Sequence, residues 1–297
     1  MEDKVLYKTL GQRMQSFYNE YFDAAPENRF EPFLAAGHQA LPVMLDCLES
    51  DAADSEARTD ALIAIGRIFE ACGPTSDSLD LVVQHAKRLA GTGITSERQA
   101  SLMAIGRSRA QSLMDGFLPL LENDAVEPIN VACWVLGYAR WEGAVAPIKQ
   151  VLDRGEPGAI QAACWALGEI GTSDAVDVLL QQLSDDERLE PALDALANAA
   201  PLEALDAMVD LLGHERMEIR LGAMVGIRST VAQHKEAVLE RGTDWMIAAL
   251  TAATEDKNAP IAVFAMVTLA ELGRKLDRER AFQVLNLRHR QESQLQN

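Results

Sequence analysis

One phrase of six letters occurs twice in this chain. It reads Ala-Cys-Trp-Val-Leu-Gly at residues 132–137 and Ala-Cys-Trp-Ala-Leu-Gly at residues 163–168. Small and apolar residues that recur at an interval of roughly 30 residues are typical of stacked helical repeats, in which each repeat buries its apolar face against its neighbours. The phrase therefore predicts a repeat array rather than a fold closed around one core.

Weaker copies of the phrase extend the array in both directions. We take the last residue of each copy as a marker, and four of the six intervals between markers are roughly 30 residues long. That length fits two helices of about three turns each with tight connections. The first and last intervals are longer and predict inserted loops. The markers are Gly66, Gly106, Gly137, Gly168, Ala197, Arg228 and Ala270.

No segment shows a sustained alternation of β-branched and polar residues, so the whole chain is predicted to be helical. We expect a single elongated domain over residues 1–297. Terminal repeats have only one neighbour and are therefore atypical. Residues 1–50 are interpreted as an N-terminal cap pair, residues 51–273 as the repeats, and residues 274–297 as a C-terminal cap helix and tail.

Residues 162–171 read A-A-C-W-A-L-G-E-I-G, and Asp-Ala-Val and Leu-Leu follow at residues 174–176 and 179–180. This pattern resembles the HEAT-like repeat, particularly the subtype found in phycobilisome lyases, over roughly residues 50 to 275. The resemblance implies an all-α, right-handed α-α superhelical solenoid of about seven to eight helix pairs, with the marker helices lining its concave surface. That repeat usually has an Arg eight residues before the marker. Arg58, Arg98 and Arg220 stand at this position, whereas the two best copies have Ile129 and Ile160.

The charge balance argues against nucleic acid as a partner. The chain has a formal net charge of −18, and only residues 274–290 are locally basic. A surface of that sign repels a phosphate backbone. Nucleic-acid binding through the basic C-terminal segment is the weakest alternative. No secretory leader or long apolar run is recognisable, so we expect a cytoplasmic protein without membrane contact.

Residues that could carry out catalysis are scarce. The five histidines are scattered without metal-ligand spacing, and no nucleophile elbow, phosphate-binding loop or dinucleotide-binding glycine motif is present. The four cysteines are interpreted as reduced structural thiols. We therefore predict no catalytic residue, no metal and no cofactor.

Aromatic residues form the one candidate site. Asn130, Trp134, Tyr138 and Trp141 follow spacings of four, four and three, which places them on one face of a helix. This face lies about 100° round from the apolar seam that includes Cys133. Trp165 takes the place of Trp134 in the next repeat, and packing between repeats is the alternative role of these rings. The predicted partner-binding residues are Met103, Asn130, Trp134, Tyr138, Trp141 and Trp165, flanked by Arg67, Arg107 and Glu169.

Two functions from different classes follow. The first is a non-catalytic scaffold or adaptor whose groove holds a protein segment with apolar or aromatic side chains and some basic residues. The second is implied by the resemblance to phycobilisome lyases: a factor that attaches or handles a linear tetrapyrrole. In that case the aromatic groove would stack the bilin, and Arg67, Arg107 or Arg140 would pair with its propionates.

Overall fold

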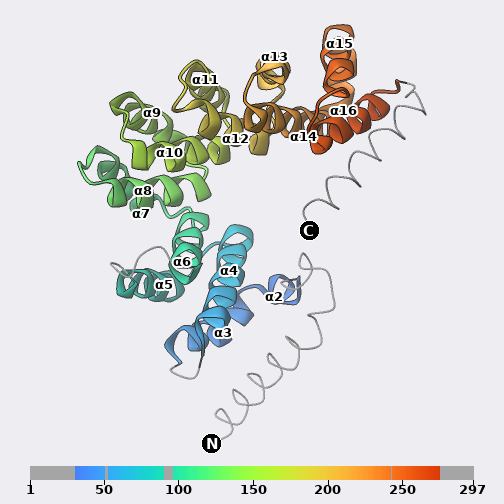
Figure 1. The fold of residues 1–297 in the computed structure, drawn as a ribbon. Coiled ribbons are helices and arrows are strands. Elements are labelled where there is room, and N and C mark those ends of the chain that lie inside the picture. The colour runs from blue at the N-terminus through green and yellow to red at the C-terminus, as the bar shows by residue number, and fades with distance from the viewer. Residues whose placement is uncertain (1–30, 51–52, 90–95, 242, 275–297) are drawn as a thin grey trace, which may run out of the picture. The chain divides into compact units, whose positions relative to one another are not determined.

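The computed structural model describes residues 31–50, 53–89, 96–241 and 243–274, and every regular element in these ranges is a helix (Figure 1). The predicted all-α class is confirmed. The chain divides into two compact units, Met1–Trp141 and Glu142–Asn297, and each is described by itself. None of the helices in the described ranges is both long and apolar enough to cross a membrane.

Unit 1 contains two layers of helices. The marker helices α4, α6 and α8 pack against one another in chain order, while α3 and α5 cover α4 and α6 as a second layer. Its elements are α2 (Glu31–Ala36), η1 (Gly37–Ala40), α3 (Leu41–Glu49), α4 (Ser55–Cys72), α5 (Ser76–Arg88), α6 (Ser96–Arg107), α7 (Gln111–Phe117), η2 (Leu118–Glu122) and α8 (Val126–Tyr138), where η denotes a 3₁₀ turn.

Unit 2 repeats this arrangement. The marker helices α10, α12, α14 and α16 stack in chain order, and Figure 1 shows α9, α11, α13 and α15 on one side of them. Its elements are η3 (Glu142–Ala144), α9 (Val145–Arg154), α10 (Pro157–Ile170), α11 (Ser173–Gln182), α12 (Leu189–Ala199), η4 (Leu202–Ala204), α13 (Leu205–Asp210), η5 (Leu211–Gly213), α14 (Met217–Arg241), α15 (Asp244–Ala253) and α16 (Ala259–Glu271).

Local signals in the sequence explain the tight turn in the second copy of the phrase. Pro157 opens α10, where a missing N–H costs nothing. Gly171 ends α10 in the left-handed conformation with φ 65°, which glycine adopts without strain. Thr172 then caps α11 by accepting a hydrogen bond from the backbone N–H of Ala175 at 3.3 Å. Two residues therefore suffice to reverse the chain.

The marker glycines allow neighbouring marker helices to approach closely. A Cβ on Gly106 would lie 2.5 Å from the carbonyl oxygen of Val135 and 2.6 Å from the Cβ of Tyr138. A Cβ on Gly168 would lie 3.0 Å from the carbonyl oxygen of Ala195. The repeated glycine is thus a packing residue that brings one backbone against the next.

The apolar seam predicted from the phrase is the core. Cys133, Leu136, Cys164 and Leu167 are fully buried. Burial raises the pKa of Cys164 to about 12, so this thiol stays protonated and acts as a small apolar packing group.

The last interval, between the markers Arg228 and Ala270, differs from its prediction. Most of the extra residues lengthen α14 to 25 residues, well past Arg228, instead of forming a loop. Val231 and Val238 keep the extension buried on one face, and the chain bends at His234, where φ is −124° and ψ is 30°. Of the predicted caps, residues 1–30 and 275–297 lie outside the described residues, and the single-domain organisation stays a prediction.

Candidate protein-interaction surfaces

The three marker helices of unit 1 each have a large apolar residue at the same repeat position that is partly open to solvent. Ile63, Met103 and Trp134 stand three residues before the markers of α4, α6 and α8, and all three are half-buried. Their immediate neighbours in sequence are buried, namely Leu62, Ala64, Leu102, Ala104, Cys133 and Val135. The equivalent position therefore lies at the edge of the core, where a partner can reach it.

The corresponding positions in unit 2 are more exposed. Trp165 on α10 is half-buried, Asp194 on α12 is exposed, and Val225 on α14 and Val267 on α16 are 37% and 36% exposed. Beside this row, the guanidinium of Arg228 lies over the ring of Phe264, 5.0 Å from its centroid. We use the name stripe for this set of equivalent repeat positions, which are Ile63, Met103 and Trp134 in unit 1, and Trp165, Asp194, Val225 and Val267 in unit 2.

The flanking residues predicted from the sequence are half-buried as well. Arg67, Arg107 and Tyr138 each follow a marker in unit 1, and Glu169 follows one in unit 2. The Nε atom of Arg107 lies 3.6 Å from Oε2 of Glu70, so part of its charge is already compensated. Asn130 is half-buried one turn before Trp134.

The helical placement of Trp141 is wrong. Helix α8 ends at Tyr138, and Arg140 takes the left-handed conformation with φ 51°. The backbone N–H of Trp141 then donates to the carbonyl oxygen of Leu136 at 3.0 Å. Trp141 is half-buried but does not continue the face of Trp134 and Tyr138. Trp134 and Trp165 belong to different units, so their juxtaposition stays a prediction.

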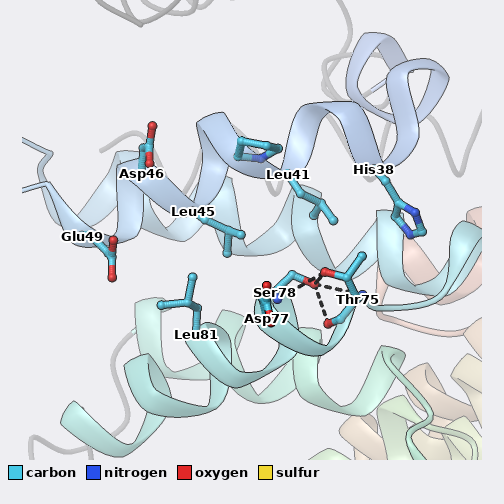
Figure 2. A pocket seen from close by; sticks show the side chains of 10 residues that line it. His38, Leu41, Leu45, Asp46, Glu49, Thr75, Asp77, Ser78 and Leu81 are labelled. Carbon is cyan, nitrogen blue, oxygen red and sulfur yellow. Dashed lines mark hydrogen bonds between the residues drawn. The ribbon is translucent and has the colours of Figure 1, made fainter. Parts of the chain in front are cut away.

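A cleft between α3 and α5 of unit 1 was missed by sequence reasoning. It has a volume of about 360 Å³, and Figure 2 shows Leu41 and Leu45 of α3 facing Ser78 and Leu81 of α5. The spacing of Leu41 and Leu45 is an ordinary helical pattern, so it does not indicate a cleft. The cleft depends on how α3 and α5 lie against each other. Its lining residues are His38, Leu41, Pro42, Leu45, Asp46, Glu49, Thr75, Asp77, Ser78 and Leu81.

A buried polar network links α4, α5 and α6. Glu97 accepts hydrogen bonds from Nε of Arg58 at 2.8 Å, from Oγ of Ser55 at 2.9 Å and from Nε2 of His85 at 2.7 Å. Arg88 donates to Nδ1 of His85 at 3.0 Å. Because Nδ1 accepts from Arg88, the proton of neutral His85 lies on Nε2, where it can donate to Glu97.

Electrostatics favour one charge state of this network. Burial lowers the pKa of His85 below its ordinary value of 6.5, although the bond to Glu97 acts in the opposite direction. Burial alone would raise the pKa of Glu97, but hydrogen bonds from Arg58, Ser55 and His85 outweigh it and hold the pKa below 4.5. The network thus holds an Arg–carboxylate pair and a neutral imidazole, an arrangement suited to joining helices.

The other two arginines that stand eight residues before a marker also pair with the following repeat. Arg98 bonds to Glu127. Arg220 places Nε 2.7 Å from Oδ2 of Asp256 and Nη2 3.3 Å from Oδ1. These arginines are therefore ties between repeats. In the described part of the chain, no group of three or more His, Cys, Asp or Glu residues is arranged to hold a metal ion.

Stacked helix pairs with a close-packed marker glycine define a helical-repeat protein. The family model described as HEAT repeats matches residues 114–191, which contain both copies of the phrase. This match confirms the predicted HEAT-like repeat for that part of the chain. No curated protein matches this sequence.

Several solved structures are similar to this chain. The CpcE and CpcF complex of phycocyanin lyase from Nostoc sp. PCC7120 shows 18% identity and a TM-score of 0.43, covering 83% of this chain and 92% of that chain. A computationally designed armadillo repeat protein for modular peptide recognition shows 18% identity and a TM-score of 0.42, covering 78% and 99%. A designed armadillo repeat protein in complex with the peptide (KR)4 shows 19% identity and a TM-score of 0.42, also covering 78% and 99%.

Proposed function

We propose that this chain is a non-catalytic scaffold that binds a protein partner through residues of the stripe. The observation that carries the proposal is a difference in solvent exposure between neighbouring residues of each marker helix. Positions beside the stripe are buried, whereas the stripe itself keeps Met103, Trp134, Trp165 and Val225 partly open to solvent. Large side chains held at the surface by rigid helices are typical of protein interfaces.

The stripe residues suit recognition by a preorganised surface. An aromatic anchor buried by a partner contributes about 2 kcal/mol or more to binding. Trp134 and Trp165 lie on helices whose core residues are fully buried, so little conformational entropy is lost when a partner binds. The net charge of −18 favours a partner segment that carries basic residues among its apolar ones.

The test is affinity capture from the native cell with wild-type protein and a Trp134→Ala/Trp165→Ala variant, followed by binding of the purified partner. Trp245→Ala is the matched control, because Trp245 is 40% exposed on α15 and lies off the stripe. We expect a partner that is retained by wild type and by Trp245→Ala but lost with the stripe variant. Equal retention by all three proteins, with helicity unchanged, would refute the proposal.

A further inference from the structure

We infer that the cleft between α3 and α5 is a second binding site, which takes a protein segment with apolar side chains flanked by lysine or arginine. The site does not depend on the stripe. It lies in the second layer of unit 1, whereas the stripe of that unit lies on α4, α6 and α8.

The floor of the cleft is apolar and partly open. Leu41 is buried, while Leu45 and Leu81 are only half-buried and point toward one another across the cleft in Figure 2. A volume of about 360 Å³ stands at the small end of the range for ligand pockets. It suits one or two large anchoring side chains of a longer segment that lies across both helices.

The polar groups at the end of the cleft already have partners. Nε2 of His38 lies 2.7 Å from the carbonyl oxygen of Gly73, which fixes the imidazole against the α4–α5 connection. Thr75 and Ser78 form a reciprocal capping box at the start of α5. Their hydroxyl groups bond to each other at 2.7 Å, and Ser78 also donates to the carbonyl oxygen of Thr75 at 2.9 Å. A small polar ligand therefore finds few unsatisfied groups there.

The charge around the apolar floor is of one sign. Asp46 and Glu49 come from α3 and Asp77 comes from α5, and none of the described lining residues is a lysine or an arginine. Within the described ranges, none of these three carboxylates forms an ion pair with a basic side chain. Carboxylates on both sides of an apolar floor complement an occupant with apolar anchors and flanking cations.

The experiment titrates the purified full chain with a short fluorescein-labelled peptide of leucine and lysine at helical spacing and follows fluorescence anisotropy. Two matched peptides separate the contributions: one replaces leucine by serine, and the other replaces lysine by glutamate. We expect only the leucine–lysine peptide to bind. We also expect its affinity to fall as salt is raised, because exposed charges are screened.

Two variants locate the binding. Leu45→Ser/Leu81→Ser removes the apolar floor and should weaken binding by about tenfold or more. Asp46→Asn/Glu49→Gln/Asp77→Asn keeps the shape of the cleft and should both weaken binding and flatten its salt dependence. Leu239→Ser on α14, where Leu239 is 44% exposed, should bind as wild type does. Circular dichroism checks that each variant keeps its helicity.

Four results would overturn the assignment. The first is that no peptide binds, and the second is that the serine or glutamate peptide binds equally well. The third is that binding is lost with Trp134→Ala but kept with Leu45→Ser/Leu81→Ser, which would move the site to the stripe. The fourth is that the chain self-associates until Leu45 and Leu81 are replaced, which would make a second copy the occupant.

Discussion

Arg58 in unit 1 and Ile160 in unit 2 occupy the same place in the repeat, eight residues before the marker, with opposite chemistry. Arg58 on α4 reaches Glu97 on α6, the next marker helix, at 2.8 Å. Ile160 on α10 is buried, and α10 packs on α12. Helix stacking in this repeat therefore tolerates a polar tie or an apolar contact at one position, provided that the polar groups all have partners.

The polar tie makes the two regions respond differently to substitution. The side chain of Glu97 is only 6% exposed, and it is the shared acceptor for three donors. Removing a shared acceptor leaves several groups uncompensated at once. Loss of an apolar group leaves only a cavity whose cost depends on how far its neighbours relax.

The largest expected effect comes from Glu97→Ala. The substitution leaves Arg58 charged and partly buried and leaves the N–H of His85 without an acceptor. Breaking a buried ion pair by removing one partner costs about 3 to 5 kcal/mol. We expect a loss of that size in the free energy of unfolding, measured by urea denaturation.

Glu190→Ala is the control for Glu97→Ala. Glu190 pairs with Arg216 at 2.7 Å, but the two side chains are 50% and 44% exposed. Exposed pairs contribute about 0 to 1 kcal/mol, so Glu190→Ala should change stability little. If the two variants lose equal stability, the buried network has no special role in joining α4, α5 and α6.

A second effect, of about 1 to 3 kcal/mol, is expected for Gly106→Ala, because the new methyl group would overlap the backbone of α8. Gly116→Ala in α7 is the matched control, since a Cβ there meets nothing within 4 Å. Alanine is the better helix former, so Gly116→Ala should be neutral or stabilising by up to about 1 kcal/mol. Thermal denaturation of both variants tests this contact, and equal stability would show that α6 and α8 can move apart without cost.

A smaller loss of stability is expected when the pH is lowered. It should affect helices α4–α6 and not helices α14–α16. The pKa of His85 is lowered in the folded protein, so its contribution to stability is complete above pH 6.5 and decreases as pH falls below that value. Asp256 in the tie to Arg220 has a pKa below 3.8, because bonds from Arg220 and Asn258 outweigh burial, so that tie weakens only in stronger acid. Between pH 7.5 and 5.5, hydrogen exchange corrected for intrinsic rate should increase in α4–α6 and stay constant in α14–α16.

Two results would contradict this pH dependence. One is uniform loss of protection in both regions, and the other is the same loss in a His85→Gln variant, which has no imidazole to titrate.

The stacking of the helices could be predicted because it is encoded locally. All seven markers fall in helices, and the glycine markers Gly66, Gly106 and Gly168 are the residues that bring helix backbones together. The helical spacing of the phrase also predicted different positions for the cysteines and the tryptophans. Cys133 and Cys164 are buried, whereas Trp134 and Trp165 are half-buried. The repeat interval and the helical spacing within each copy of the phrase are enough to predict these features.

The network, the cleft and the end of α8 could not be predicted in this way. Glu97 is one of 45 acidic residues, and only the packing of α4, α5 and α6 makes it the partner of Arg58 and His85. The cleft depends on the distance between α3 and α5, which no residue pattern reports. Helix α8 stops before Trp141 because Arg140 is left-handed, a conformation that the helical spacing of the aromatic residues did not indicate.

The smallest net change in stability is expected when the whole polar network is replaced by apolar residues, as at Ile160. The variant Arg58→Ile/His85→Leu/Glu97→Leu removes the buried charges and the imidazole together. Ser55 and Arg88 are exposed and can bond to water instead. Replacing a buried ion pair by apolar residues of similar volume is often neutral or stabilising, so the variant should stay within about 1 kcal/mol of wild type despite the large loss expected for Glu97→Ala. If urea denaturation shows that the variant is strongly destabilised, then the specific hydrogen bonds of this network stabilise the packing of α4, α5 and α6. Compensation of the buried charges would then not be its only role.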